Sequence, residues 1–137
     1  MKSHSKIEVA VTALLRAKEL FLLGDLVSAT ILAGAGQQIL RDICENRGIE
    51  PTITTISDVS GHPVKLVRNL VAETYNKMKH ADNDPEVIIE VSEEEPRMLM
   101  TLAATDLMRL DEIKSKEISD FVDFIQAIKV SQPPSPT

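Results

Sequence analysis

The chain has 137 residues, a formal net charge of −6 and a pI of about 5.0. This length suits a single domain with its own core, and the acidic balance argues against DNA and anionic membranes as partners. Hydrophobic residues make up 43% of the chain and charged residues 26%, which excludes disorder over most of its length. With no Trp, one Tyr and three Phe, the core must consist of aliphatic side chains, which suit closely packed helices.

The cysteine and histidine content limits the chemistry that this chain can carry. Its single cysteine, Cys44, has no partner for an intramolecular disulfide, which indicates a reducing compartment. Charged residues interrupt the apolar residues of the first 23 positions, so we expect neither a signal peptide nor a membrane span and predict a cytoplasmic protein. Metal-binding spacings and glycine-rich phosphate motifs are absent from the sequence, so we expect no metal and no cofactor.

Two long helices are predicted at the start of the chain. Polar residues recur at helical spacing from Ser5 to Leu23. Asp25 can then cap a second helix that reaches about Arg47, where Gly48 can supply a left-handed end. The short connection predicts an antiparallel hairpin. The apolar surface of these two helices is too broad for a small bundle to cover, so we expect a homodimer.

Two glycines interrupt the second predicted helix. Gly34 and Gly36 each cost roughly 1 kcal/mol relative to alanine inside a helix, so a compensating interaction is expected. Close backbone approach by a neighbouring helix, which small side chains permit, is the explanation that we favour. The alternative is a ligand pocket at Gly34 with polar walls formed by Thr30, Gln37 and Arg41.

The middle of the chain is predicted to hold one helix between two irregular segments. Residues 48–61 are rich in Thr, Ser, Pro and Gly without a helical period, so we expect a loop. A third helix begins at His62-Pro63 and ends near His80. Its inward stripe is predicted to contain Val67, Leu70, Val71, Thr74 and Met78. The run from Val87 to Val91 is either an extended linker or a lone strand.

Two further helices complete the predicted fold. Ser92 and Glu95 resemble a capping box before a fourth helix, whose core stripe is Leu99, Leu102, Ala103, Leu107 and Leu110. A fifth helix over residues 116–129 has an apolar face of Ile118, Phe121, Val122, Ile125 and Ile128. Residues 131–137 are expected to form a disordered tail. The sequence thus predicts an all-α, up-down bundle of four to five helices in one domain, residues 1–130.

The clustered polar residues of this chain lie at the end of the third predicted helix, in the word YNKMKH. On a helix, Asn76 and His80 are four residues apart and share a face. A histidine at a helix C-terminus ordinarily caps the last carbonyl groups. The same position also allows it to donate a proton or to bind a phosphate oxygen with help from Lys77 and Lys79.

The order of these elements resembles the HEPN superfamily of helical bundles over about residues 10–110. The shared features are two long helices with a small-residue patch, a loop, a third helix that ends in Asn76-x-x-x-His80, and a fourth helix. The resemblance implies a dimer and, in the ribonuclease members, an Arg-x(4-6)-His motif in a composite site. Here Asn76 and His80 match the polar and histidine positions, whereas Tyr75 replaces the arginine. Tyrosine supplies no fixed positive charge for a scissile phosphate, so the motif is predicted to be degenerate.

Three functional hypotheses follow from the sequence. The one that we favour is a non-catalytic, HEPN-like module that binds a protein partner or a nucleotide-like ligand; its candidate contacts are Tyr75, Asn76, Lys79 and His80, with Asp25 and Gln37 as additions. The second is a metal-independent ribonuclease of toxin type, in which His80 donates a proton and Asn76 orients the phosphate. The third is a purely structural helical dimer.

Overall fold

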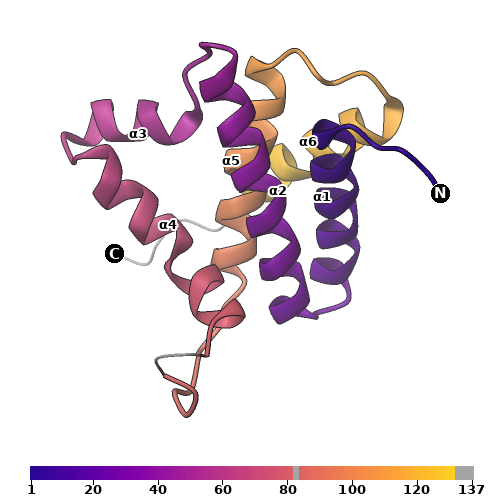
Figure 1. Ribbon diagram of the computed structural model, residues 1–137. Coiled ribbons are helices and arrows are strands. Elements are labelled where there is room, and N and C mark those ends of the chain that lie inside the picture. The colour runs from indigo at the N-terminus through magenta and orange to yellow at the C-terminus, as the bar shows by residue number, and fades with distance from the viewer. Residues whose placement is uncertain (82–83, 132–137) are drawn as a thin grey trace.

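The computed structural model describes residues 1–81 and 84–131, and within these residues the chain is all-helical, with no strand (Figure 1). The all-α fold predicted from the sequence is therefore confirmed. The helices are α1 (Lys6–Leu22), α2 (Leu26–Asn46), α3 (Thr52–Ser60), α4 (Val64–Lys79), α5 (Glu94–Arg109) and α6 (Lys116–Ser131).

α1 and α2 form the antiparallel hairpin that the sequence predicts, and their ends are set by local capping (Figure 1). The Ser5 hydroxyl accepts a hydrogen bond from the Glu8 backbone N–H at 3.1 Å. The Asp25 carboxylate accepts one from the Ser28 N–H, also at 3.1 Å. Gly48 has a φ of +70°, the left-handed conformation that follows the end of α2. Asp25 and Gly48 thus have the structural roles predicted for them.

The glycines of α2 lie where other side chains press against the helix. A Cβ added to Gly36 would lie 2.7 Å from the Cγ of Leu14 and 3.1 Å from the Ala10 carbonyl oxygen, both on α1. A Cβ added to Gly34 would lie 2.6 Å from the ring of Tyr75, on α4. The close backbone approach predicted for these glycines is seen at Gly36, whereas Gly34 makes room for the Tyr75 side chain. Gly34 is therefore the point where α4 packs on α2.

The prediction of a loop over residues 48–61 is wrong, because nine of these residues form α3. Its β-branched residues are weak helix formers, so the helix depends on tertiary contacts. The Asp106 carboxylate, on α5, accepts hydrogen bonds from the backbone N–H and the hydroxyl of Thr52, at 2.8 and 2.7 Å. Ile53 is buried in the core, and Gly61, with a φ of +76°, ends the helix.

α4 packs against α2 and α3 and shows a broad face to solvent (Figure 1). Val67 and Val71 are buried and Met78 is half-buried, as the predicted stripe requires. Leu70, predicted to face inward, is 60% exposed, because no helix covers that side of α4. The side chain of Thr74, the remaining member of the stripe, lies outside the described part of the chain.

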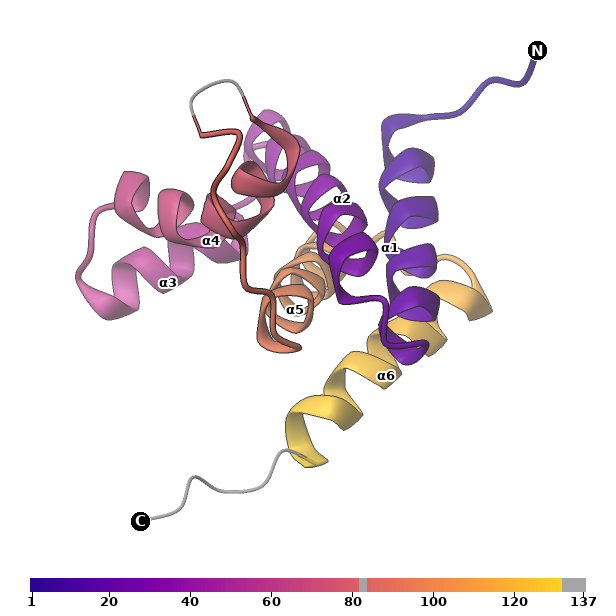
Figure 2. The same cartoon turned by 90° about the horizontal axis from the view of Figure 1, so that it is seen from below.

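α5 and α6 close the core on the other side of the hairpin. α5 packs along α2, and α6 crosses below α1 and α5 (Figure 2). The whole predicted stripe of α5 is buried, and so is that of α6 except for the half-buried Ile128. Residues 87–91 have no strand structure, so the extended-linker alternative is the correct one. Of the predicted tail, Ser131 ends α6 and residues 132–137 lie outside the described residues.

Candidate functional site

The first candidate site is the C-terminal end of α4, where Tyr75 and Lys79 form a defined pair. The Tyr75 ring lies against Gly34 of α2 and is half-buried. The Lys79 ammonium lies 4.3 Å from the centre of this ring, within the range of a cation–π interaction. Tyr75 therefore joins α4 to α2, and Lys79 covers its outer side.

Asn76 lies in the last turn of α4, and His80 is the residue that follows the helix. α4 ends at Lys79, and His80 follows it with extended backbone, at φ −127° and ψ 131°. Both Asn76 and His80 are exposed, and among the described residues neither side chain makes a hydrogen bond. A general acid has to be held within reach of the atom that it protonates. Within residues 1–81 and 84–131, no group is seen to hold His80 in this way.

The other two predicted ligand contacts, Asp25 and Gln37, belong to α2 and its N-cap and not to the end of α4. The Asp25 carboxylate is used to cap α2 in the hairpin turn. Gln37 is buried on α2, about one helical turn after Gly34. Thr30, one turn before Gly34, is also buried and donates its hydroxyl to the Leu26 carbonyl at 2.7 Å. The alternative of a ligand pocket at Gly34 is wrong, because the Tyr75 ring occupies that space.

A second candidate site, missed from the sequence, is a groove between α4 and α5. It encloses about 320 Å³ and is lined by Leu70, Val71, Glu94, Glu95, Met98 and Leu99. Val71 and Leu99 are buried and form the floor, whereas Leu70 is 60% exposed and Met98 38% exposed at its edges. Leu66, one turn before Leu70, is 43% exposed and extends the aliphatic surface along α4.

The α5 side of this groove is negatively charged. The Glu95 carboxylate accepts hydrogen bonds from the hydroxyl and the backbone N–H of Ser92, at 2.7 and 2.8 Å. The bond from the Ser92 hydroxyl is the main reason why the pKa of Glu95 lies below its usual value. Glu95 is therefore ionised at neutral pH, beside the exposed carboxylate of Glu94. Arg97, the nearby cation on α5, is paired with Glu93 at 3.3 Å.

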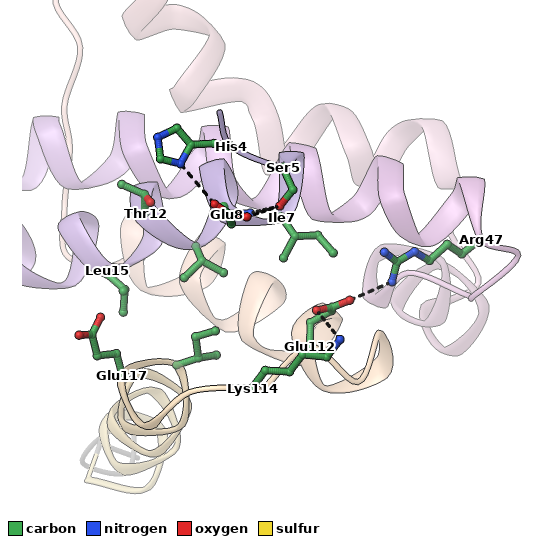
Figure 3. Close-up of a pocket in the computed structure, with 12 residues that line it drawn as sticks. His4, Ser5, Ile7, Glu8, Thr12, Leu15, Arg47, Glu112, Lys114 and Glu117 are labelled. Carbon is green, nitrogen blue, oxygen red and sulfur yellow. Dashed lines mark hydrogen bonds and ion pairs between the residues drawn. The ribbon is translucent and has the colours of Figure 1, made fainter. Parts of the chain in front are cut away.

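A third candidate site is a larger cavity beside the first half of α1 (Figure 3). It encloses about 640 Å³ between α1, the end of α2, the link after α5 and the start of α6. Ile7, Val11, Leu15 and Ile118 provide its apolar surface. Its polar groups are His4, Ser5, Glu8, Thr12, Arg47, Glu112, Lys114 and Glu117. These groups come from separate parts of the chain, so no motif could have predicted the cavity.

A buried carboxylate and a buried thiol lie near the junction of α2, α3 and α5. Asp106 is 1% exposed, and its Oδ2 has no hydrogen-bond partner among the described residues. Burial raises the pKa of Asp106, against the opposing effect of the bonds from Thr52. Burial also raises the pKa of Cys44 to about 11, so this thiol remains protonated and is a poor nucleophile. Both groups have structural roles.

Comparison with known proteins identifies no relative. The chain matches no protein-family model, no curated protein and no solved structure. The HEPN-like resemblance thus rests on the helix order and on the residues of α4, and it stays a prediction.

Among the described residues, no helix is long and apolar enough to cross a membrane. Within residues 1–81 and 84–131, no group of three or more His, Cys, Asp or Glu side chains is placed to hold a metal ion.

Proposed function

We propose that this protein is a non-catalytic helical module that binds a protein partner in the groove between α4 and α5. The observation that carries the proposal is the exposed side chain of Leu70 on α4, which lines the groove together with Met98 of α5 above the buried Val71 and Leu99. An amphipathic helix can bind such a groove by inserting apolar residues at i, i+3, i+4 and i+7.

The charges around the groove specify the kind of helix that it fits. Glu94 and Glu95 place two carboxylates beside the aliphatic floor, and the chain carries a net charge of −6. A partner helix with Lys or Arg beside its apolar stripe would meet opposite charge on the α5 side. We therefore expect a basic amphipathic helix as the occupant of the groove.

The geometry at the end of α4 supports a module without catalytic activity. His80 and Asn76 lack positioning contacts among the described residues, and Tyr75 replaces the motif arginine while packing on Gly34. Three of the four cations of α4 have partners: Lys77 is 2.9 Å from Glu73, Arg68 pairs with Glu45, and Lys79 lies over Tyr75, while Lys65 lies at the opposite end of the helix. The C-terminus of a helix also carries partial negative charge, which disfavours a phosphate. A nucleotide-like ligand is therefore the weaker alternative. HEPN membership, a homodimer and a cytoplasmic location remain predictions.

The binding proposal can be tested with a synthetic peptide. The probe is a fluorescent amphipathic helix of Leu and Lys, compared by anisotropy with a peptide of the same composition that lacks helical periodicity. We expect the amphipathic peptide to bind more tightly, and Leu70→Asp to weaken its binding about tenfold or more, since a charge replaces a central anchor. The control is Leu23→Asp, because Leu23 is 77% exposed at the hairpin turn, outside the groove.

Two results would contradict the proposal. One is equal peptide binding by wild-type protein and Leu70→Asp. The other is a dimer in sedimentation experiments that Leu70→Asp, but not Leu23→Asp, dissociates, because the groove would then hold a second copy of this chain.

The ribonuclease alternative has a separate test. We expect the purified protein to leave single-stranded RNA intact, since nothing described in the structure holds His80 for proton transfer. Cleavage by the wild-type protein that His80→Ala abolishes would refute a non-catalytic function.

A further inference from the structure

The cavity beside α1 has a different chemistry from the groove between α4 and α5. Its volume of about 640 Å³ is in the range of small-molecule sites. It follows α1 from Ser5 to Leu15, ten residues of helix, which corresponds to a length of about 15 Å at the usual rise per residue. The aliphatic side chains of Val11 and Ile118 line it together with its charged groups.

One end of the cavity carries an excess of positive charge. Arg47, at the end of α2, lies 3.2 Å from a carboxylate oxygen of Glu112. Lys114 lies 3.4 Å from the other oxygen of the same carboxylate. Glu112 is only 13% exposed, whereas Arg47 and Lys114 are 43% and 70% exposed. One carboxylate thus holds two cations in place and neutralises one of them, and both cations keep N–H donors for a ligand.

The other end of the cavity carries negative charge. Figure 3 shows Glu117 beside Leu15, at the opposite end from Arg47. Glu117 is exposed, and no described side chain forms an ion pair or a hydrogen bond with it. Glu8 lies between the two ends, and its pKa is lowered by the contacts with His4 and Ser5. Glu8 is therefore ionised at neutral pH, and Glu117 adds a second carboxylate to the cavity lining.

We propose that this cavity binds a small linear zwitterion, of the ω-amino acid class, that carries its carboxylate and its ammonium group at opposite ends. The carboxylate lies at Arg47 and Lys114, and the methylene chain covers the aliphatic side chains. The ammonium group lies at Glu117, with Glu8 nearby. A diamine of the same length would place an ammonium group against Arg47, and a dicarboxylate would place a carboxylate against Glu117. The cavity therefore selects against both.

Calorimetric titration of the full chain with 6-aminohexanoate and 8-aminooctanoate tests this assignment, and diamines and dicarboxylates of matching length serve as controls. We expect at least one ω-amino acid to bind about tenfold more tightly than either control, because each control exchanges an attraction for a repulsion. No measurable binding of either ω-amino acid at millimolar concentration, or equal binding of all three ligand classes, would overturn the proposal.

A charge reversal at one end provides the second test. Glu117→Lys should invert the preference, so that the dicarboxylate binds more tightly than the ω-amino acid. Asp123→Lys is the matched control, because it makes the same change in charge at an exposed position of α6 outside the cavity, and it should keep the wild-type preference. An unchanged preference in Glu117→Lys, or an inversion in both variants, would show that the selectivity does not arise in this cavity.

Discussion

The core formed by α1, α2 and α5 and the outer layer formed by α3 and α4 use similar aliphatic residues with different results. In the core, Leu14, Leu40 and Leu99 are at most 2% exposed. In the outer layer, Leu66 and Leu70 are 43% and 60% exposed. Leucines at helical spacing therefore do not show by themselves whether a face is covered. That depends on whether another helix is available to cover it, and α4 has neighbours only on one side.

The difference has a functional meaning. Buried aliphatic side chains stabilise the folded state. Exposed aliphatic side chains beside charged groups are, by contrast, a feature of binding surfaces. The following experiments test whether the two layers differ as the structure indicates.

The largest effect is expected from truncation in the core. Leu40→Ala should lower the free energy of unfolding by about 3 kcal/mol, because it leaves a cavity among closely packed side chains. Leu70→Ala should change it by less than about 0.5 kcal/mol, since Leu70 is largely exposed. Urea denaturation of both variants measures the contrast. Similar losses for the two variants would mean that the outer face of α4 is covered in solution.

A smaller effect is expected where the two layers meet. Gly34→Ala should destabilise the protein by about 1–3 kcal/mol, because the new methyl group overlaps the Tyr75 ring. In a Tyr75→Ala background, Gly34→Ala should stabilise the protein by about 1 kcal/mol, which is the difference in helix propensity between glycine and alanine. A double-mutant cycle by urea denaturation measures this coupling. If Gly34→Ala alone stabilised the protein, the contact between the Tyr75 ring of α4 and Gly34 of α2 would be contradicted.

The buried carboxylate that anchors α3 should influence the pH dependence of stability. The pKa of Asp106 is raised in the folded protein, so the folded state retains this proton at a pH where the unfolded chain has lost it. The contribution of Asp106 to stability should therefore decrease as pH rises from its usual pKa to its folded pKa. Asp106→Asn should remove this slope, as measured by denaturation across the acidic range. An unaltered slope in the variant would show that other groups cause it.

The smallest effect is expected at Glu95, on the rim of the groove. The pH dependence of its contribution to stability is opposite to that of Asp106. The pKa of Glu95 is lowered by the Ser92 hydroxyl, so its stabilising contribution is present above the usual pKa of glutamate and is lost as pH falls. Glu95→Gln should cost about 0.5 kcal/mol or less at neutral pH, because Glu95 is only half-buried. The cost should disappear in acid, and a cost that persists there would show that packing is responsible.

The residues of the candidate sites show how far sequence reasoning reached. The helix caps at Asp25 and Gly48 and the close backbone approach at Gly36 were predicted correctly, whereas the side chain of Tyr75 that lies against Gly34 was not foreseen. The end of this helix near His80 was also predicted correctly, since α4 ends at Lys79. Asp106 offered an overlooked signal, since it is a carboxylate next to the buried Leu107 in the apolar stripe of α5.

What the sequence determined by itself is the all-α class, the long helices and their caps, because these depend on residues within four positions of one another. What only the tertiary structure decided depends on partners far apart in the chain. α3 forms because Thr52 meets Asp106, 54 positions later. Leu70 is exposed because none of the described helices covers it, and Arg47 and Glu117 line one cavity because α2 ends and α6 begins beside α1. A local pattern specifies which side of a helix is apolar, and the packing of the whole chain decides what that side meets.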